Sequence, residues 1–115
     1  MGMQVVLGER ELSVKISGME VYAILKKELK IPYASIVNVQ TGSFEFPLTA
    51  VRRTGITTMG YKAGSFVIHG EKYFLSYHNA HQVVILSLKG AEFDKIVLES
   101  EAPEQLANDI RARCS

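Results

Sequence analysis

Residues 83–104, VVILSLKGAEFDKIVLESEAPE, decide the fold that this sequence predicts. Val83–Leu88 and Ile96–Leu98 are apolar runs of strand length, and Lys89-Gly90-Ala91 between them is typical of a turn. This pattern predicts a hairpin. Pro103 follows at a position suited to the first turn of a helix, where a missing amide hydrogen costs nothing. The chain is therefore expected to close with a hairpin followed by a helix.

The expected C-terminal helix has charges that match its dipole. Glu104 complements the positive N-terminal end, and Arg111 and Arg113 complement the negative C-terminal end. Leu106 and Ile110 are four residues apart and share one stripe of the helix. We expect this stripe to cover an open end of a β-sheet, because an uncovered end exposes apolar side chains and unpaired edges.

Working back from the hairpin, the sequence predicts further strands. Leu12, Val14 and Ile16 alternate with polar residues, as in a strand with one buried face. The turn residues His69-Gly70-Glu71 separate two more apolar runs and predict a second hairpin. About seven strands are expected, over residues 5–7, 12–16, 36–39, 66–68, 73–77, 83–88 and 96–98.

One short helix is expected after the second strand. Ser17-Gly18-Met19-Glu20 has the spacing of a capping box, and Pro32 limits how far a helix could continue. Apolar residues follow the box at helical spacing, at Val21, Ile24, Leu25 and Leu29. The sequence therefore predicts an amphipathic helix lying on the sheet.

This order of elements matches the pleckstrin-homology-like (PH-like) fold. Over roughly residues 5 to 113 the chain resembles an uncharacterised bacterial PH-like family, and the closing hairpin and helix are the most specific part. The resemblance implies a strongly bent antiparallel barrel with a C-terminal capping helix, which serves as a binding or assembly module without an assigned reaction. The stretches that carry it are residues 29–36 (LKIPYASI), 53–55 (RTG), 64–66 (GSF), 73–74 (YF), 78–79 (HN), 84–90 and 96–104.

The sequence departs from the lipid-binding PH domains of eukaryotes, which resemble one another in a basic cluster on the first hairpin and a tryptophan on the terminal helix. Here the first turn is Gly8-Glu9-Arg10-Glu11, in which two carboxylates flank one arginine, and the chain has no tryptophan. Phosphoinositide binding of that kind is not expected.

Composition indicates one globular domain over residues 1–115, with 47% hydrophobic and 22% charged residues. Thirteen basic and twelve acidic residues leave a net charge of +1, so the overall charge does not favour binding to nucleic acid. Cys114 is the one cysteine, which excludes an internal disulfide and favours a reducing cytoplasm. No apolar run approaches the roughly 18 residues of a membrane span, and no signal peptide is recognisable.

Few residues suggest chemistry. His78 and His81 could share a metal if a turn brought them together, but two ligands are too few for a structural zinc site. The simpler hypothesis is a loop with solvated imidazoles and with Asn79 in a left-handed turn conformation. Cys114 lacks a base and an orienting acid, and Gly55, Gly60 and Gly64 suit turns better than a phosphate loop. We expect no catalytic residue, no metal and no cofactor.

The segment Ser43–Lys62 shows no sustained periodicity yet is rich in aromatic and basic residues. These side chains either have a packing role, in which they cover the flank of the barrel or extend irregular strands, or form an interaction surface, for which aromatic residues and arginine are typical. Arg52 and Arg53 could also pair with a phosphate or carboxylate. The candidate interaction residues are Phe44, Phe46, Arg52, Arg53, Tyr61 and Lys62.

Three functions follow, in order of preference. The first is a cytoplasmic module that self-associates or docks a protein through sheet edges and the Ser43–Lys62 segment. The second is a binder of a small anionic ligand or lipid headgroup, using Arg52, Arg53 and a lysine stripe. That stripe, Lys26, Lys27 and Lys30, is more simply a solvated helix face. The last is a metal-assisted hydrolase using His78 and His81.

Overall fold

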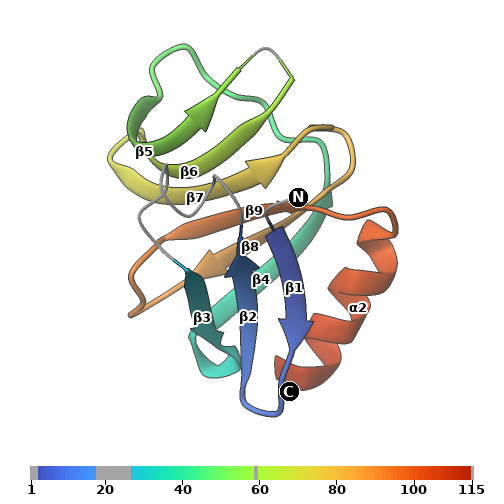
Figure 1. Ribbon diagram of the computed structural model, residues 1–115. Coiled ribbons are helices and arrows are strands. Elements are labelled where there is room, and N and C mark those ends of the chain that lie inside the picture. The colour runs from blue at the N-terminus through green and yellow to red at the C-terminus, as the bar shows by residue number, and fades with distance from the viewer. Residues whose placement is uncertain (1–2, 18–26, 59, 115) are drawn as a thin grey trace.

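A computed structural model describes residues 3–17, 27–58 and 60–114. This part of the chain contains nine β-strands, a 3-10 turn and one α-helix (Figure 1). The protein is therefore mainly β, and the C-terminal helix is confirmed. The elements are β1 (Met3–Leu7), β2 (Glu11–Ile16), β3 (Glu28–Pro32), the 3-10 turn (Tyr33–Ser35), β4 (Ile36–Gly42), β5 (Val51–Thr57), β6 (Lys62–Ile68), β7 (Glu71–Tyr77), β8 (Val83–Leu88), β9 (Lys95–Glu99) and α2 (Pro103–Cys114).

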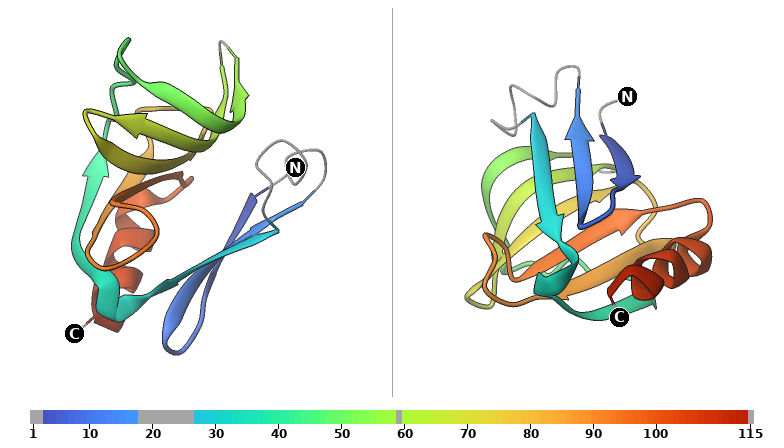
Figure 2. Two further views of the ribbon diagram at one scale, coloured as in Figure 1. Left: turned by 90° about the vertical axis from the view of Figure 1, so that its left-hand side faces the viewer. Right: turned by 90° about the horizontal axis from the view of Figure 1, so that it is seen from below.

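The strands form two sheets. A three-stranded sheet has the order β1-β2-β3, and a six-stranded sheet has the order β4-β8-β9-β7-β6-β5. The two sheets meet at the 3-10 turn Tyr33–Ser35 and diverge from it (Figure 2). The helix α2 packs against β4 and β8 of the larger sheet. Within the described residues no helix is both long and apolar enough to cross a membrane.

The larger sheet is not purely antiparallel, which differs from the barrel that the sequence predicts. β7 and β9 pair in parallel, with Phe74 opposite Ile96 and Leu75 opposite Val97. The chain passes from β7 to β8 across a gap one strand wide, and the β8–β9 hairpin folds back so that β9 fills it. Local sequence patterns do not encode this arrangement, because they report hairpins between neighbours only.

Both predicted hairpins are confirmed. β6 and β7 pair around a two-residue turn in which His69 and Gly70 both have positive φ, 51° and 80°. This is the backbone of a turn whose twist matches that of the flanking strands. β8 pairs with β9 as expected, and Gly90 in their connection also has a positive φ of 73°.

β3 corrects one end of the predicted first helix. Leu29 was assigned to a helical stripe, but it lies in a strand, opposite Val14 of β2. Leu29 and Ile31 are buried while Glu28 and Lys30 are exposed, which is the two-residue alternation of a strand with one buried face. The rest of the predicted helix, over residues 18–26, lies outside the described residues.

β5 is the second strand that the sequence pattern misses. A bulge between Arg52 and Thr54 shifts its register against β6, which breaks the two-residue period. Gly55 then lies opposite Gly64, and both have left-handed φ values, 113° and 132°. A Cβ on Gly55 would lie 2.0 Å from the carbonyl oxygen of Ala63. The interpretation of these two glycines as turn residues is therefore wrong, because they let two strand backbones approach closely.

The larger sheet buries side chains on both faces. We call the cluster between the two sheets and α2 the inner core; it includes Leu12, Ile31, Phe74, Leu86, Ile96 and Ile110. Adjacent strand residues point to opposite faces, so Leu75 and Val97 lie in a second cluster, the outer core. The outer core also contains Phe66, Ile68, Tyr77 and Val83.

The predicted stripe of the terminal helix is confirmed. Ile110 and Ala107 of α2 are fully buried in the inner core, and Leu106 packs against it. The helix is also tied to the edge of the sheet, because Arg111 Nη2 donates a hydrogen bond of 2.8 Å to the carbonyl oxygen of Val39 in β4. α2 thus closes the β4 side of the larger sheet.

Candidate functional site

The structure divides the Ser43–Lys62 segment into a cover and an edge strand. Residues 43–50 cross the outer core, residues 51–57 form β5, and residues 60 and 61 lead into β6. The aromatic and basic residues that the sequence singles out consequently lie in three different places.

Phe44 and Phe46 belong to the cover. The ring of Phe44 lies 5.9 Å from that of Tyr73, and the ring of Phe46 lies 5.5 Å from that of Phe66 in an edge-on arrangement. Lys62 joins them, because its ammonium group lies 5.1 Å from the centre of the Phe46 ring. These three side chains have a packing role on the outer core, which is the simpler of the two roles considered for them.

Arg52 and Arg53 lie on β5, the last strand of the larger sheet, and both are exposed. Neither makes an ion pair with another described residue. Two apolar side chains are exposed close by: Val51 on the same strand is 60% exposed, and Leu48 in the cover is fully exposed. No described strand pairs with the outer side of β5.

Tyr61 is separated from the other candidates. It packs against the inner core, and its ring stacks on the imidazole of His78 with centres 4.2 Å apart and planes 16° from parallel. The candidates therefore form a covering group, an exposed pair of arginines and one tyrosine on the opposite face.

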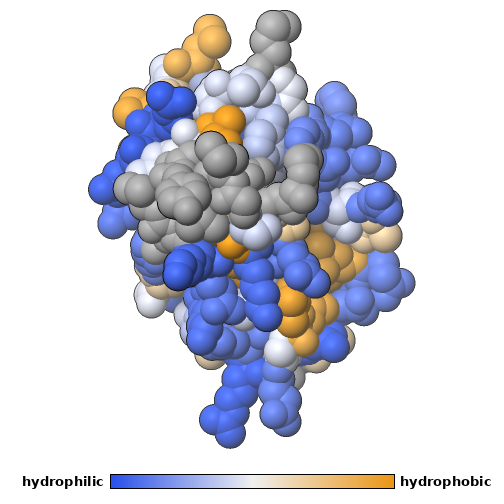
Figure 3. Space-filling model, viewed as in Figure 1, coloured by the Kyte–Doolittle hydropathy of each residue, from blue (hydrophilic) through white to orange (hydrophobic). Residues whose placement is uncertain are grey.

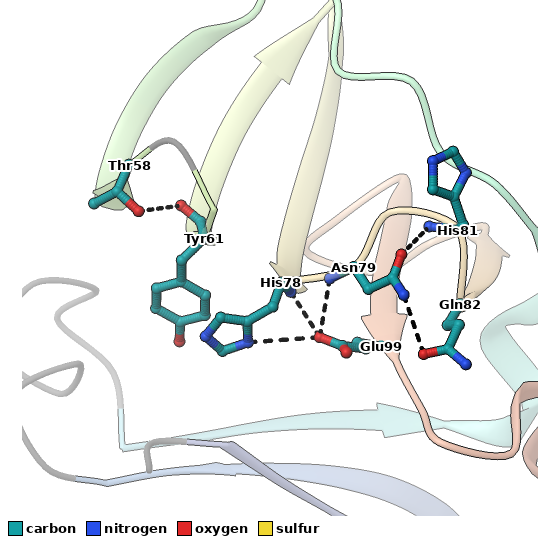
Figure 4. A network of polar contacts seen from close by, with 7 residues as sticks. All are labelled: Thr58, Tyr61, His78, Asn79, His81, Gln82 and Glu99. Atoms are coloured by element: carbon teal, nitrogen blue, oxygen red, sulfur yellow. Dashed lines mark hydrogen bonds and ion pairs between the residues drawn. The ribbon is translucent and has the colours of Figure 1, made fainter.

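The two histidines proposed as metal ligands have different partners (Figure 4). His78 Nδ1 lies 3.5 Å from Glu99 Oε1, whereas His81 Nδ1 lies 3.0 Å from the hydroxyl of Ser43. Figure 4 shows the two rings on opposite sides of Asn79. The described residues contain no group of three or more histidine, cysteine, aspartate or glutamate side chains that could hold a metal ion. The turn thus keeps the two imidazoles apart.

The loop holds this arrangement by hydrogen bonds to side chains. The Asn79 carbonyl oxygen Oδ1 accepts a bond of 2.9 Å from the backbone amide of His81, and the Asn79 amide group donates to Gln82. A left-handed conformation for Asn79 was wrong, because His69 is the one described non-glycine residue with positive φ. The side-chain bond stabilises the turn instead.

Glu99 is the residue of this region that sequence reasoning missed. Its two-residue spacing from Glu101 is typical of the solvent-exposed face of a strand, but its Oε1 accepts hydrogen bonds from the backbone amides of His78 (2.6 Å) and Asn79 (3.3 Å). The partners are 20 and 21 residues apart and meet because β7 and β9 run in parallel, so no local signal could have identified them.

The other reactive or basic groups are ordinary surface groups. Partial burial raises the pKa of the Cys114 thiol, which favours the unreactive protonated form. Lys27 and Lys30 are exposed, and Lys30 lies 4.0 Å from a carboxylate oxygen of Glu11. Lys26, the third member of the predicted lysine stripe, lies outside the described residues.

The sequence and structure of this chain were compared with known proteins. No protein-family model, curated protein or solved structure matches it.

Proposed function

We propose that this chain is a non-catalytic binding and assembly module that engages a protein strand at the outer edge of β5. The observation that carries this proposal is that β5 has no described neighbour on its outer side, while the side chain of Val51 on this strand and that of Leu48, in the cover just before it, are exposed. An edge strand offers a row of unpaired backbone donors and acceptors, which is a template for an added strand.

The charge of β5 favours one kind of partner. The strand carries Arg52 and Arg53 and no acidic residue. Two copies paired through this edge would bring four arginines together, and like charges near one another across paired strands are destabilising. An extended acidic segment of another protein is therefore the favoured occupant, and a second copy of the chain is the alternative.

The PH-like assignment is part of the same proposal, as is a location in the reducing cytoplasm. The PH-like assignment is supported by the closing β8–β9 hairpin, which is followed by a helix that packs on the sheet. The parallel pairing of β7 with β9 departs from an all-antiparallel barrel. The proposed binding mode is the addition of a strand at the β5 edge, which relies on the unpaired backbone groups of that edge rather than on the PH-like assignment.

Two matched valines test the proposal. Val51 on β5 and Val37 on β4 are 60% and 62% exposed, and each lies on an edge strand of the same sheet. We expect an acidic extended peptide to shift the backbone amide NMR signals of β5 and to bind more weakly as salt rises. Val51→Lys should change this binding, whereas Val37→Lys should leave it unchanged.

Light scattering during size-exclusion chromatography tests the second-copy form. A mass that rises with concentration, and that Val51→Lys returns to the monomer, would replace the acidic peptide with a second copy. A monomer at every concentration, together with unshifted β5 amides, would overturn the proposed function.

A binder of an anionic small molecule or lipid headgroup is the second candidate function, because Arg52 and Arg53 are exposed and make no described ion pair. Sedimentation with phosphatidylserine vesicles should then exceed that with phosphatidylcholine vesicles and decrease with salt. Equal sedimentation with both would remove this candidate. A metal-assisted hydrolase is not favoured, because His78 and His81 engage different partners.

A further inference from the structure

A small cleft lies on the opposite side of the larger sheet from the cover. It has a volume of about 210 Å³ and opens where the C-terminal ends of β7 and β9 approach the start of β1. None of the residues of the β5 edge lines it. Its lining includes Met3, Tyr61, Ser76, His78, Glu99 and Glu101.

Ser76 is the unusual residue of this cleft. Among the described residues it is the one polar side chain in the buried class, with 8% of its surface exposed. It pairs across the sheet with Ala63 and Leu98, both of which are buried in the inner core, so an apolar residue would suit the position. No hydrogen bond within the described part of the chain involves its hydroxyl. The one fully buried side-chain nitrogen or oxygen without a hydrogen-bond partner among the described residues is Thr54 Oγ1. The Ser76 hydroxyl is therefore not sealed from solvent, and the residue lines the cleft.

Glu99 supplies a positioned charge in the same cleft as this hydroxyl. Its side chain is 29% exposed, and its Oε1 is held by the two backbone amides and the imidazole described above. Oε2 makes no hydrogen bond or ion pair within the described residues. The carboxylate is thus fixed through one oxygen, while the other oxygen remains available to a donor.

The remaining lining fits a positively charged ligand. Glu101 adds a second carboxylate, and the cleft has no lysine or arginine in its lining. The stacked rings of Tyr61 and His78 form a flat wall beside Glu99 (Figure 4). Aromatic faces attract cations and pack against hydrocarbon. A metal ion is less suited, because the described residues contain no group of three metal-ligating side chains.

We propose that this cleft binds the ammonium group of a small organic amine. The ammonium group has three N–H donors, and Glu99 Oε2 and the Ser76 hydroxyl oxygen would accept hydrogen bonds from it. The hydrocarbon part of the amine would lie against the ring of Tyr61. The volume of the cleft limits the ligand to a molecule of a few heavy atoms, since drug-sized ligands occupy larger pockets. This site is independent of the β5 edge and of the proposed docking function.

The test is an NMR titration of the full chain with ethanolamine, with sodium acetate at the same ionic strength as the control. We expect saturable shifts of the amides of residues 61, 76–79 and 99–101 with the amine alone. Ser76→Ala should weaken binding roughly tenfold, the size of one hydrogen bond to a charged group. Glu101→Gln, on an exposed side chain, should weaken it less.

Stability separates a binding role of Ser76 from a structural one. Ser76→Ala removes a hydroxyl that has no described partner, so the melting temperature should stay the same or rise while binding falls. Ser87→Ala on β8, outside the cleft, is the matched control and should leave binding unchanged. Absence of saturable shifts, equal shifts with acetate, or unchanged affinity in both Ser76→Ala and Glu101→Gln would each overturn the proposal.

Discussion

The two edges of the six-stranded sheet are built in opposite ways. β4 is covered by α2, whose Arg111 donates a hydrogen bond to the Val39 carbonyl oxygen and whose Glu104 accepts a bond from the Thr41 hydroxyl. β5 has no such cover within the described residues; it carries a bulge, two exposed arginines and an exposed valine. Bulges and charges on an edge strand oppose unspecific pairing without blocking the backbone.

This contrast indicates how selectivity could be built into one sheet. A covered edge is unavailable to any partner, whereas an edge protected by charge and a bulge remains available to a partner of opposite charge. The surface in the view of Figure 3 adds a third edge, where apolar side chains are visible over β1 among mostly hydrophilic neighbours. Val5, Val6 and Leu7 of β1 are only partly buried. β5 differs from β1 because it carries two arginines, whose positive charge favours a partner of negative charge, whereas β1 carries no charged residue.

The largest expected effect concerns the covered side. Ile110→Ala removes a fully buried side chain of α2 from the inner core, and such substitutions cost about 2–5 kcal/mol of the free energy of unfolding. Urea denaturation should show a lower midpoint with an unchanged slope. Gln105→Ala, on the exposed side of the same helix, is the control. If both variants lost the same stability, α2 would not be the element that holds the β4 side together.

Residue patterns predicted the covered side better than the open one. β2, the β8–β9 hairpin and α2 follow simple periods of two or about 3.6 residues, because each presents one face to the core. β5 does not, because its bulge and Gly55 interrupt the period at the centre of the strand. β3 was missed for another reason. Leu29 lies at helical spacing from earlier apolar residues, and its strand conformation depends on pairing with β2, which local spacing does not indicate.

The candidate sites were harder to predict than the fold. The arginines of β5 could be chosen from composition, and the structure places both at an edge. Phe44 and Phe46 could be chosen too, but composition does not distinguish an aromatic cover from an aromatic interface. The cleft beside Ser76 and Glu99 depends on a parallel strand pair, so residues far apart in the sequence meet there without any local motif.

A change at Gly55 tests how the open side is built. Gly55→Ala places a methyl group against the backbone of Ala63 and Gly64 in a left-handed conformation, which should cost roughly 2–4 kcal/mol through strain and overpacking. Hydrogen exchange should accelerate first in the amides that join β5 to β6. Gly60→Ala is the matched control, because no atom lies within 4 Å of its Cβ position and its φ is not in the left-handed region. Equal stability of the two variants would show that β5 does not need the close approach of Gly55 to Gly64.

The smallest effect is a pH dependence of the outer core, which lies beneath the cover on the open side. Burial raises the pKa of the Tyr77 phenol above its ordinary value near 10. Above about pH 10 the unfolded chain loses this proton before the folded chain does, so the free energy of unfolding decreases as pH rises. Tyr77→Phe should therefore match the wild type at neutral pH and decline less steeply in alkaline solution, as measured by urea denaturation at a series of pH values.

In Tyr77→Phe the free energy of unfolding should still decrease somewhat in alkaline solution, because burial also raises the pKa of Tyr33. The Tyr33 hydroxyl donates a hydrogen bond of 2.9 Å to the Gly8 carbonyl oxygen. Tyr73→Phe, on the same strand as Tyr77 and half-buried, is the matched control for loss of a hydroxyl. An alkaline decline in Tyr77→Phe as steep as that of the wild type would mean that solvent reaches the Tyr77 phenol. The cover formed by residues 43–50 would then be open in solution, and the β5 side would be less closed than its packing indicates.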